Sequence, residues 1–321
     1  MPEQLGLFTE ENTLFNTATQ QILDMDFSGC LESLVLYQKR FPWGRDVGPI
    51  IEIASFLSVR LAKESRGAMG PEEVEGRYQV WQEFETAFGY PWQAGSFQER
   101  LQTNYFSVLV NGLVSGGCGG GIELPGGTPV GLIYLLAGRI REAAKSLEAL
   151  IQEKHRSAAA CGYLGDAYLL LGDVDRARLC YREAFTIEPA QVDLKRLQDG
   201  ELRLFLETIS EDEAFERDPV AWLPVAGQLE GFFERRVLRD QADLDRWLAR
   251  YLELLESQTQ SGDMSLIPRL FYHAMVLSDN AHVMRLTGKT DVLEIRRNMK
   301  KWQPVVFARH MEKLDSKEKR P

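Results

Sequence analysis

Two consecutive segments of the chain, 124–157 and 158–191, have equal length and share a pattern of small and aromatic residues. In the second segment, Gly165 and Ala177 are small enough to let two antiparallel helices approach closely. Gly172 lies between them and can adopt the left-handed backbone conformation that ends a helix. A period of this length predicts a helix–turn–helix unit that buries its apolar face by stacking on neighbouring units.

Residues 158–191 resemble a tetratricopeptide repeat, a two-helix unit whose length this segment has. The resemblance is carried by Leu164, Gly165, Tyr168, Gly172, Asp173, Ala177, Tyr181, Ala184 and Pro189. Cys161 stands where the family has an early tryptophan. Asp173 is able to cap the second helix, whereas Pro189 cannot continue it and forces a turn into the next unit.

Two other segments fit the same register in part. In 124–157 the corresponding residues are Gly131, Tyr134, Gly138, Ala143 and Leu147. Pro125 and Pro129 shorten the first helix of this segment, and His155 replaces the terminal proline. A third, degenerate match is 11–44, with Asp26, Cys30, Leu34 and Pro42 at equivalent places. Since an array needs about three or more units, we expect flanking helices to close its ends.

Nearly every segment has helical periodicity, and no alternating run of strand length occurs. The sequence therefore predicts an all-α fold, an α-superhelix of tetratricopeptide-like helix–turn–helix repeats with flanking non-repeat helices. We expect four parts: an N-terminal helical region with the degenerate repeat (1–115), a Gly-rich loop (116–128), the repeats with the following helix (129–215), and a C-terminal helical region (216–321). The two prolines and the glycine within 216–233 predict a break before the last part.

The Gly-rich loop contains Cys118 among its glycines and has two familiar explanations that its sequence does not support. It lacks G-x-G-x-x-G at the offsets of a dinucleotide site, and no strand is predicted before it. It also lacks the G-x-x-x-x-G-K-[ST] pattern of a phosphate loop. Elsewhere in the chain, Gly288-Lys289-Thr290 lacks the first glycine of that pattern. We interpret 116–128 as a flexible connection between helices. A reactive Cys118 thiol, or a loop that orders over a ligand, stays an alternative.

Charge and composition exclude several classes of protein. The formal net charge of −10 repels free nucleic acid and anionic membranes, so we expect neither as a partner. The N-terminal residues do not resemble a signal peptide, and no apolar run is long enough to span a membrane. The four cysteines form no CxxC pair, which indicates free thiols and a cytoplasmic protein. The four histidines show no ligand spacing, so we predict no metal and no other cofactor.

The resemblance implies where a partner would bind, because the first helices of tetratricopeptide arrays line a concave groove that holds peptides or partner helices. The lining positions are Ala159, Gly162, Asp166, Leu169 and Leu170 in the second segment and Pro125, Thr128, Leu132, Leu135 and Leu136 in the first. We select Leu132, Leu135, Leu136, Asp166, Leu169 and Leu170 as candidate partner-binding residues. This apolar set does not match the basic carboxylate-clamp type and suits an apolar peptide or an amphipathic helix. Alternatively, the chain's own flanking helices cover these leucines.

The C-terminal segment 294–321 is basic, with nine Lys and Arg against four Asp and Glu. It could bind an anionic partner. Its large apolar residues favour packing on the chain's own body or on a second copy, and they are Trp302, Val305, Val306, Phe307 and Met311. No arrangement of acid, base and nucleophile is specified anywhere. We therefore predict a non-catalytic protein-interaction scaffold or adaptor, with a homodimer left open. The alternative is an enzyme or a small-ligand-binding domain formed by the unassigned C-terminal helices.

Overall fold

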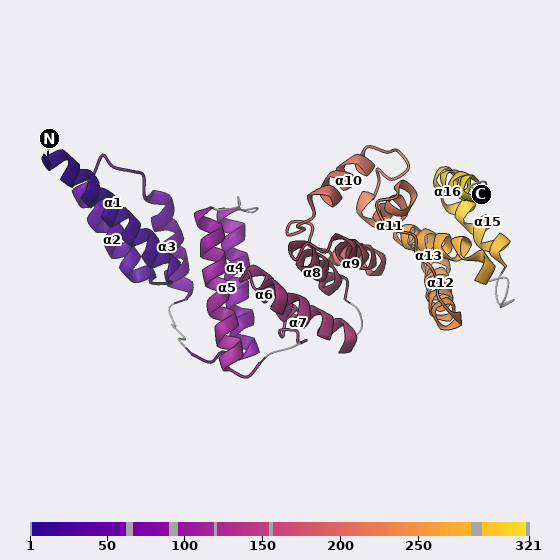
Figure 1. The fold of residues 1–321 in the computed structure, drawn as a ribbon, viewed down its shortest axis with the longest axis horizontal. Helices are drawn as coiled ribbons and strands as arrows, with labels where there is room; N and C mark the ends of the chain where they lie inside the picture. Colours follow the sequence, from indigo (N-terminus) through magenta and orange to yellow (C-terminus); the bar gives the residue numbers. More distant parts are fainter. Residues whose placement is uncertain are drawn as a thin grey trace. The chain divides into compact units, whose positions relative to one another are not determined.

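The computed structural model describes residues 2–61, 67–89, 96–118, 121–153, 157–283 and 291–318. Within these ranges every regular element is a helix, and one isolated bridge pairs Glu123 with Pro129 (Figure 1). The all-α prediction is confirmed. None of the helices described is long and apolar enough to cross a membrane. His155 and the sequence Gly288-Lys289-Thr290 lie outside the described residues.

The chain divides into two compact units, Met1–His155 and Arg156–Pro321. The division falls between the two repeat-like segments, inside the predicted part 129–215. The four-part division of the chain stays a prediction. We describe each unit by itself.

Unit 1 is a series of helices in which each packs on the next along the chain. They are α1 (Pro2–Leu23), α2 (Phe27–Arg40), α3 (Gly48–Arg60), α4 (Pro71–Phe88), α5 (Phe97–Ser115), α6 (Val130–Leu136) and α7 (Ile140–Glu153). The side chain of Asp26 caps α2 and that of Ser96 caps α5, each by accepting a hydrogen bond from a backbone N–H three residues later. The degenerate segment 11–44 is a helix pair, made by α1 and α2, in which Cys30 is buried.

Residues 124–128 of the Gly-rich loop form a tight turn before α6. The N–H of Leu124 bonds to the carbonyl of Thr128 at 2.8 Å, and Gly127 has a positive φ of 82°. Its glycines also allow close packing. A Cβ atom at Gly116 would lie 2.5 Å from the carbonyl oxygen of Met69, and one at Gly121 would lie 2.7 Å from a backbone carbon of Ala149 in α7. At these two positions the loop is closely packed, which the interpretation as a flexible connection did not anticipate.

Three helices of unit 2 are buried along most of their length, α8, α11 and α13. Its elements are α8 (Ala158–Leu170), α9 (Val174–Ile187), η1 (Pro189–Gln191), α10 (Gly200–Ser210), α11 (Pro219–Glu230), α12 (Gln241–Ser261), η2 (Met264–Leu266), α13 (Ile267–Asp279), α15 (Val292–Trp302) and α16 (Pro304–Glu318). Helix α11 contacts α9, α10, α13 and α16. It therefore joins the repeat-like pair α8–α9 to the C-terminal helices.

The predicted break at 216–233 is wrong, because α11 runs through most of this segment. Pro219 occupies the first turn, where its missing N–H costs nothing. Pro224 lies inside the helix, where a proline costs about 3 kcal/mol. Burial of every residue from 221 to 229 offsets that cost. The helix ends at Gly231, which has the left-handed conformation with φ 79°.

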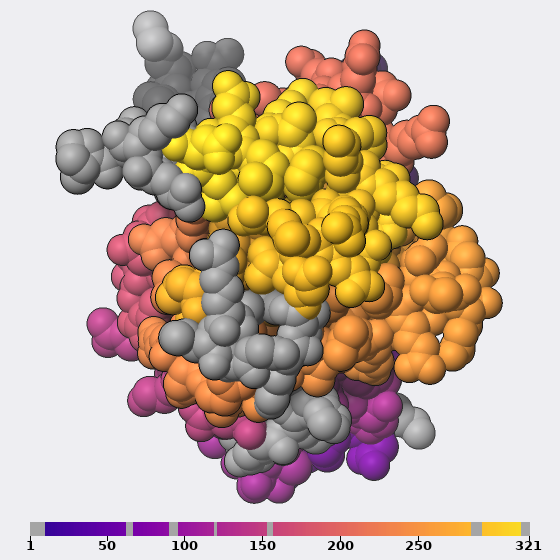
Figure 2. Space-filling model, turned by 90° about the vertical axis from the view of Figure 1, so that its right-hand side faces the viewer, coloured from indigo at the N-terminus to yellow at the C-terminus, as the bar shows by residue number. Residues whose placement is uncertain are grey.

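The C-terminal segment packs on unit 2, as its apolar residues predict. Val306 and His310 of α16 are buried, and Arg309 forms an ion pair with Asp212 in the turn after α10. The Lys313 ammonium donates to the carbonyl of Leu229 at the end of α11. Figure 2 shows α15 and α16 as one yellow surface of unit 2. Packing is confirmed for the described part of this segment, with Val305 as an exposed exception.

Candidate protein-binding surface

The two repeat-like pairs make the same close contact at equivalent positions. In α8 a Cβ atom at Gly165 would lie 2.6 Å from Cε1 of Tyr181 in α9. At the equivalent position of α6, a Cβ atom at Gly131 would lie 2.8 Å from Cδ2 of Leu147 in α7. Both distances are below any normal Cβ contact, so only glycine permits the observed helix spacing.

The turns of the two pairs are equivalent as well. Gly138 and Gly172 both have positive φ, 71° and 82°. Asp173 accepts a hydrogen bond from the N–H of Arg176 and caps α9, as predicted. Because α6 begins only after Pro129, it spans 7 residues, against 13 for α8. The two pairs therefore have one geometry at the turn and the close contact, with a first helix that is shorter in unit 1.

Asp166 is the polar member of the predicted set, and it is buried in α8. One carboxylate oxygen accepts hydrogen bonds from the hydroxyl of Tyr181 at 2.6 Å and from the N–H of Gln198 at 2.9 Å. Burial is the main cause that raises the pKa of Asp166 to about 7, although both hydrogen bonds favour the charged form. This carboxylate is therefore engaged within the chain.

A segment that sequence reasoning missed lies over the same part of α8. Residues 192–199, called the 192–199 segment below, connect η1 to α10 and form no regular helix. The side chain of Val192 reaches 3.6 Å from where a Cβ of Gly162 would lie, and the hydroxyl of Tyr163 bonds to Asp193 at 3.4 Å. With the bond from Gln198, the segment contacts α8 at two of the predicted lining positions. No hydrophobic periodicity in the sequence predicts this segment, because it has no regular secondary structure.

Leucines at the carboxyl-terminal end of α8 remain accessible. Leu169 is half-buried, and Leu170 is 51% exposed. Leu171 and Val174, which lie on either side of the turn to α9, are exposed too. Sequence analysis did not select Leu171 and Val174, because they fall outside the lining positions that the family resemblance implies. Together these residues form an apolar surface at the turn.

The leucines selected in α6 lie differently. Leu132 and Leu136 are buried, the latter with 9% of its surface exposed, and Leu135 is half-buried. Helix α6 packs on both α5 and α7. For Leu132 and Leu136 the geometry favours the alternative that the chain itself covers them. The assignment of all six residues to partner binding stays a prediction.

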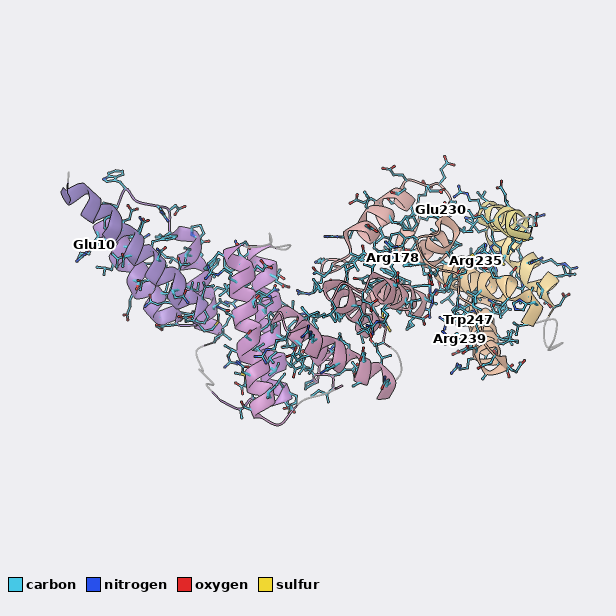
Figure 3. The ribbon with its side chains drawn as sticks, in the orientation of Figure 1. Glu10, Arg178, Glu230, Arg235, Arg239 and Trp247 are labelled. Carbon is cyan, nitrogen blue, oxygen red and sulfur yellow. The ribbon has the colours of Figure 1, made fainter. Side chains whose placement is uncertain are left out.

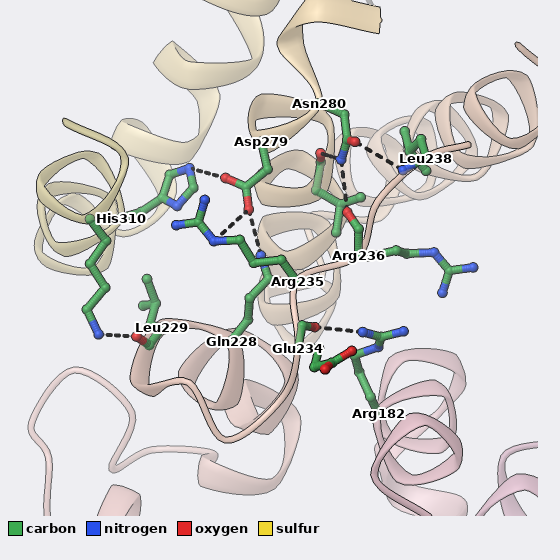
Figure 4. Close-up of polar contacts among 12 residues, drawn as sticks. Arg182, Gln228, Leu229, Glu234, Arg235, Arg236, Leu238, Asp279, Asn280 and His310 are labelled. Atoms are coloured by element: carbon green, nitrogen blue, oxygen red, sulfur yellow. Dashed lines mark hydrogen bonds and ion pairs between the residues drawn. The ribbon is translucent and has the colours of Figure 1, made fainter. Parts of the chain in front are cut away.

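Polar side chains elsewhere in unit 2 bridge helices. Trp247 of α12, which Figure 3 labels, stacks on His273 of α13 with ring centroids 4.4 Å apart. Asp279 of α13 accepts from the amide of Gln228 at 2.8 Å and lies 3.6 Å from Nε2 of His310 in α16 (Figure 4). Burial and nearby arginines lower the pKa of His310 to about 3, so it is neutral. Each of these groups links different elements, which indicates a structural role.

Figure 4 shows a second set of such bridges around Asn280. Its side chain donates to the carbonyl of Arg236 at 3.0 Å and accepts from the N–H of Leu238 at 3.0 Å. Arg182 of α9 donates to the carbonyl of Glu234 at 2.7 Å. These bonds hold the irregular segment 231–240 against α9 and α13. Across the ranges that the structure describes, no group of three or more His, Cys, Asp and Glu side chains is arranged to hold a metal ion.

Comparison with known proteins gives one finding that bears on this surface. The family model of the tetratricopeptide repeat matches residues 158–191, which are α8, α9 and η1. No curated protein and no solved structure matches the chain. The repeats assigned at 124–157 and 11–44 stay predictions, supported by the helix pairs and, for 124–157, by the equivalent glycine contacts.

Proposed function

Because the chain contains a tetratricopeptide repeat, a unit that generally mediates protein–protein interaction, we propose that it is a non-catalytic scaffold or adaptor. Its partner is a protein that presents an apolar peptide or the apolar face of a helix. The four cysteines are free thiols, which suits the cytoplasm as the site of action. A homodimer is a further form that the scaffold could take.

The observation that carries this proposal is the exposure of Leu170. It occupies a lining position of the repeat that the family model matches, and about half of its surface is open. Leu171 and Val174 extend the apolar surface around it. An apolar anchor docked on such leucines gains roughly 25 cal/mol for each Å² of apolar surface that it buries. Leu132 and Leu136 contribute to binding only if the parts of the chain that cover them move away.

The test compares two surface leucines. Leu170→Glu places a charge on the proposed surface, and Leu252→Glu does the same on α12, where Leu252 is 49% exposed. Wild type and both variants are immobilised and used to capture proteins from native lysate. We expect proteins that bind wild type and Leu252→Glu but not Leu170→Glu, while all three melt alike. Capture of the same proteins by all three forms would contradict the proposal.

A further inference from the structure

We propose that the 192–199 segment is an internal ligand of α8, and that the binding partner is a short irregular peptide that displaces it. Such a peptide places a branched apolar side chain over Gly162 and a backbone N–H at Asp166, as Val192 and Gln198 do now. This inference rests on the proposed function, and it adds the chemistry of the partner and the way in which the surface is regulated.

The contacts define what the surface recognises. The branched side chain of Val192 packs over Gly162, where it lies 3.6 Å from the position of an added Cβ, and it is buried there. One helical turn further on, Asp166 accepts the N–H of Gln198 at 2.9 Å. A main-chain donor satisfies this contact whatever the side chain of the residue that bears it. The surface thus combines one apolar site with one main-chain site, about 6 Å apart along the helix.

The equivalent pair in unit 1 shows that helix packing does not require this polar arrangement. The positions of Asp166 and Tyr181 are occupied there by Leu132 and Leu147, which are both buried. The glycine contact is nevertheless kept. The Tyr181 hydroxyl supplies only one of the two donors that the Asp166 oxygen receives, and the 192–199 segment supplies the other. The carboxylate therefore serves to hold a peptide on α8.

Few polar bonds join the segment directly to α8. The segment has no regular structure of its own, and its exposed residues are Leu194, Lys195 and Gln198. Its buried residues are Val192, Arg196, Leu197 and Asp199. Its polar bonds to α8 are the one to Asp166 and the longer one from Tyr163 at 3.4 Å. Irregular segments open at a lower free energy than the helices of a domain. A competing peptide has to supply an N–H for Asp166, because release of the segment removes one of the two hydrogen bonds to this buried carboxylate and leaves only the bond from Tyr181.

The experiment uses the full chain and a synthetic peptide with the sequence of residues 191–199, QVDLKRLQD, that carries a fluorophore. In one variant, residues 192–198 are replaced by a Gly-Ser linker of equal length. We expect saturable binding of the peptide to this variant, and at least tenfold weaker binding to wild type, whose own segment competes at a high effective concentration. A peptide with Val192→Asp should bind neither protein. Adding Asp166→Leu to the replaced variant should abolish binding.

If the replaced variant keeps its helix content and binds the peptide no better than wild type, the inference is wrong. If it does not fold, Asp193→Ala takes its place, since this removes the contact with Tyr163 and the ion pair with Arg196 at 3.0 Å. We expect faster hydrogen exchange at the Gln198 amide and at least threefold tighter peptide binding than wild type. An unchanged exchange rate and affinity would overturn the inference. Some lysate proteins could require Leu170 for binding and yet bind wild type and Asp193→Ala equally. That result would contradict this inference and leave the proposed function standing.

Discussion

The helix pairs α6–α7 and α8–α9 share a backbone arrangement but differ in what they place around it. Both have a glycine packed against a large side chain of the second helix, and a left-handed glycine at the turn. The pair in unit 1 is apolar at the positions where the pair in unit 2 has the Asp166–Tyr181 hydrogen bond. The two pairs therefore share the close approach of their helices at the glycine, whereas the residues around this contact differ in polarity.

Exposure separates the two pairs as clearly as polarity does. Leu136 and Leu170 occupy equivalent positions in the two segments, yet the first is buried and the second is half exposed. The difference teaches that a family's lining position identifies a place on the helix and not its accessibility. Accessibility depends on what the rest of the chain packs there.

The largest expected effect comes from placing a charge at these two leucines. Leu136→Glu should lower the free energy of unfolding by roughly 3 kcal/mol or more, because the carboxylate is buried without a partner. Leu170→Glu should change it by about 0.5 kcal/mol or less, as exposed substitutions usually do. Urea unfolding measures both. Equal losses would show that the two positions do not differ in accessibility.

A smaller effect is expected at the shared contact. Gly131→Leu and Gly165→Leu should each cost on the order of 1–3 kcal/mol, since the added side chain overpacks the space against Leu147 or Tyr181. The matched control is Gly76→Leu in α4, where a Cβ meets no atom within 4 Å. Thermal melting should show a lower Tm for the first two variants and no decrease for the control. An unchanged Tm for Gly165→Leu would sink the assignment of α8 and α9 as a close pair.

The polar pair in unit 2 should make stability depend on pH. The pKa of Asp166 is raised from 3.8 to about 7, so between these pH values the folded state binds more protons than the unfolded state. The contribution of this group to stability therefore falls as the pH rises from about 4 to 7. Asp166→Asn should remove that slope, which urea unfolding at several pH values will reveal.

Tyr181→Phe provides the complementary measurement. It deletes a hydrogen bond that favours the charged carboxylate, so the pKa of Asp166 should rise further. The free energy of unfolding should then continue to fall up to a higher pH than in wild type. Parallel stability curves for wild type and Asp166→Asn would contradict the raised pKa.

The smallest effect is a difference in labelling rate, with no change in stability. Cys118 in the Gly-rich loop is half-buried, whereas Cys161 in α8 is buried. A thiol reagent should therefore label Cys118 first, and Cys161 only as unit 2 opens. Mass spectrometry of a time course measures both rates. Faster labelling of Cys161 would mean that the α8–α9 pair opens readily under native conditions.

Sequence alone predicted the elements with strong periodic signals. The α8–α9 pair follows from the spacing of Gly165, Gly172 and Ala177, and the family model matches the same residues. Helix α11 was missed because prolines and a glycine usually interrupt helices. Pro224 is tolerated there only because neighbouring helices bury the segment on all sides, and that environment is not encoded nearby in the chain.

The candidate surface was predicted less well than the fold. Asp166 was selected as a partner-binding residue, which stays a prediction. Its hydrogen-bond donors come from Tyr181 and from Gln198, an irregular position 32 residues later. No periodic pattern predicts where an irregular segment returns to a helix. The burial of Leu136 likewise depends on packing around α6, which a pattern within 124–157 does not contain.

The close-packed glycines of the loop have a consequence for inherited variation. Every missense change of a glycine codon adds at least a Cβ atom. At Gly116 and Gly121 that atom would lie within 3 Å of another segment's backbone. Loops are ordinarily the places where a population accumulates harmless changes. At these two loop positions a substitution should be tolerated as badly as one at the contact between two paired helices. An inserted residue elsewhere in the turn should cost little stability.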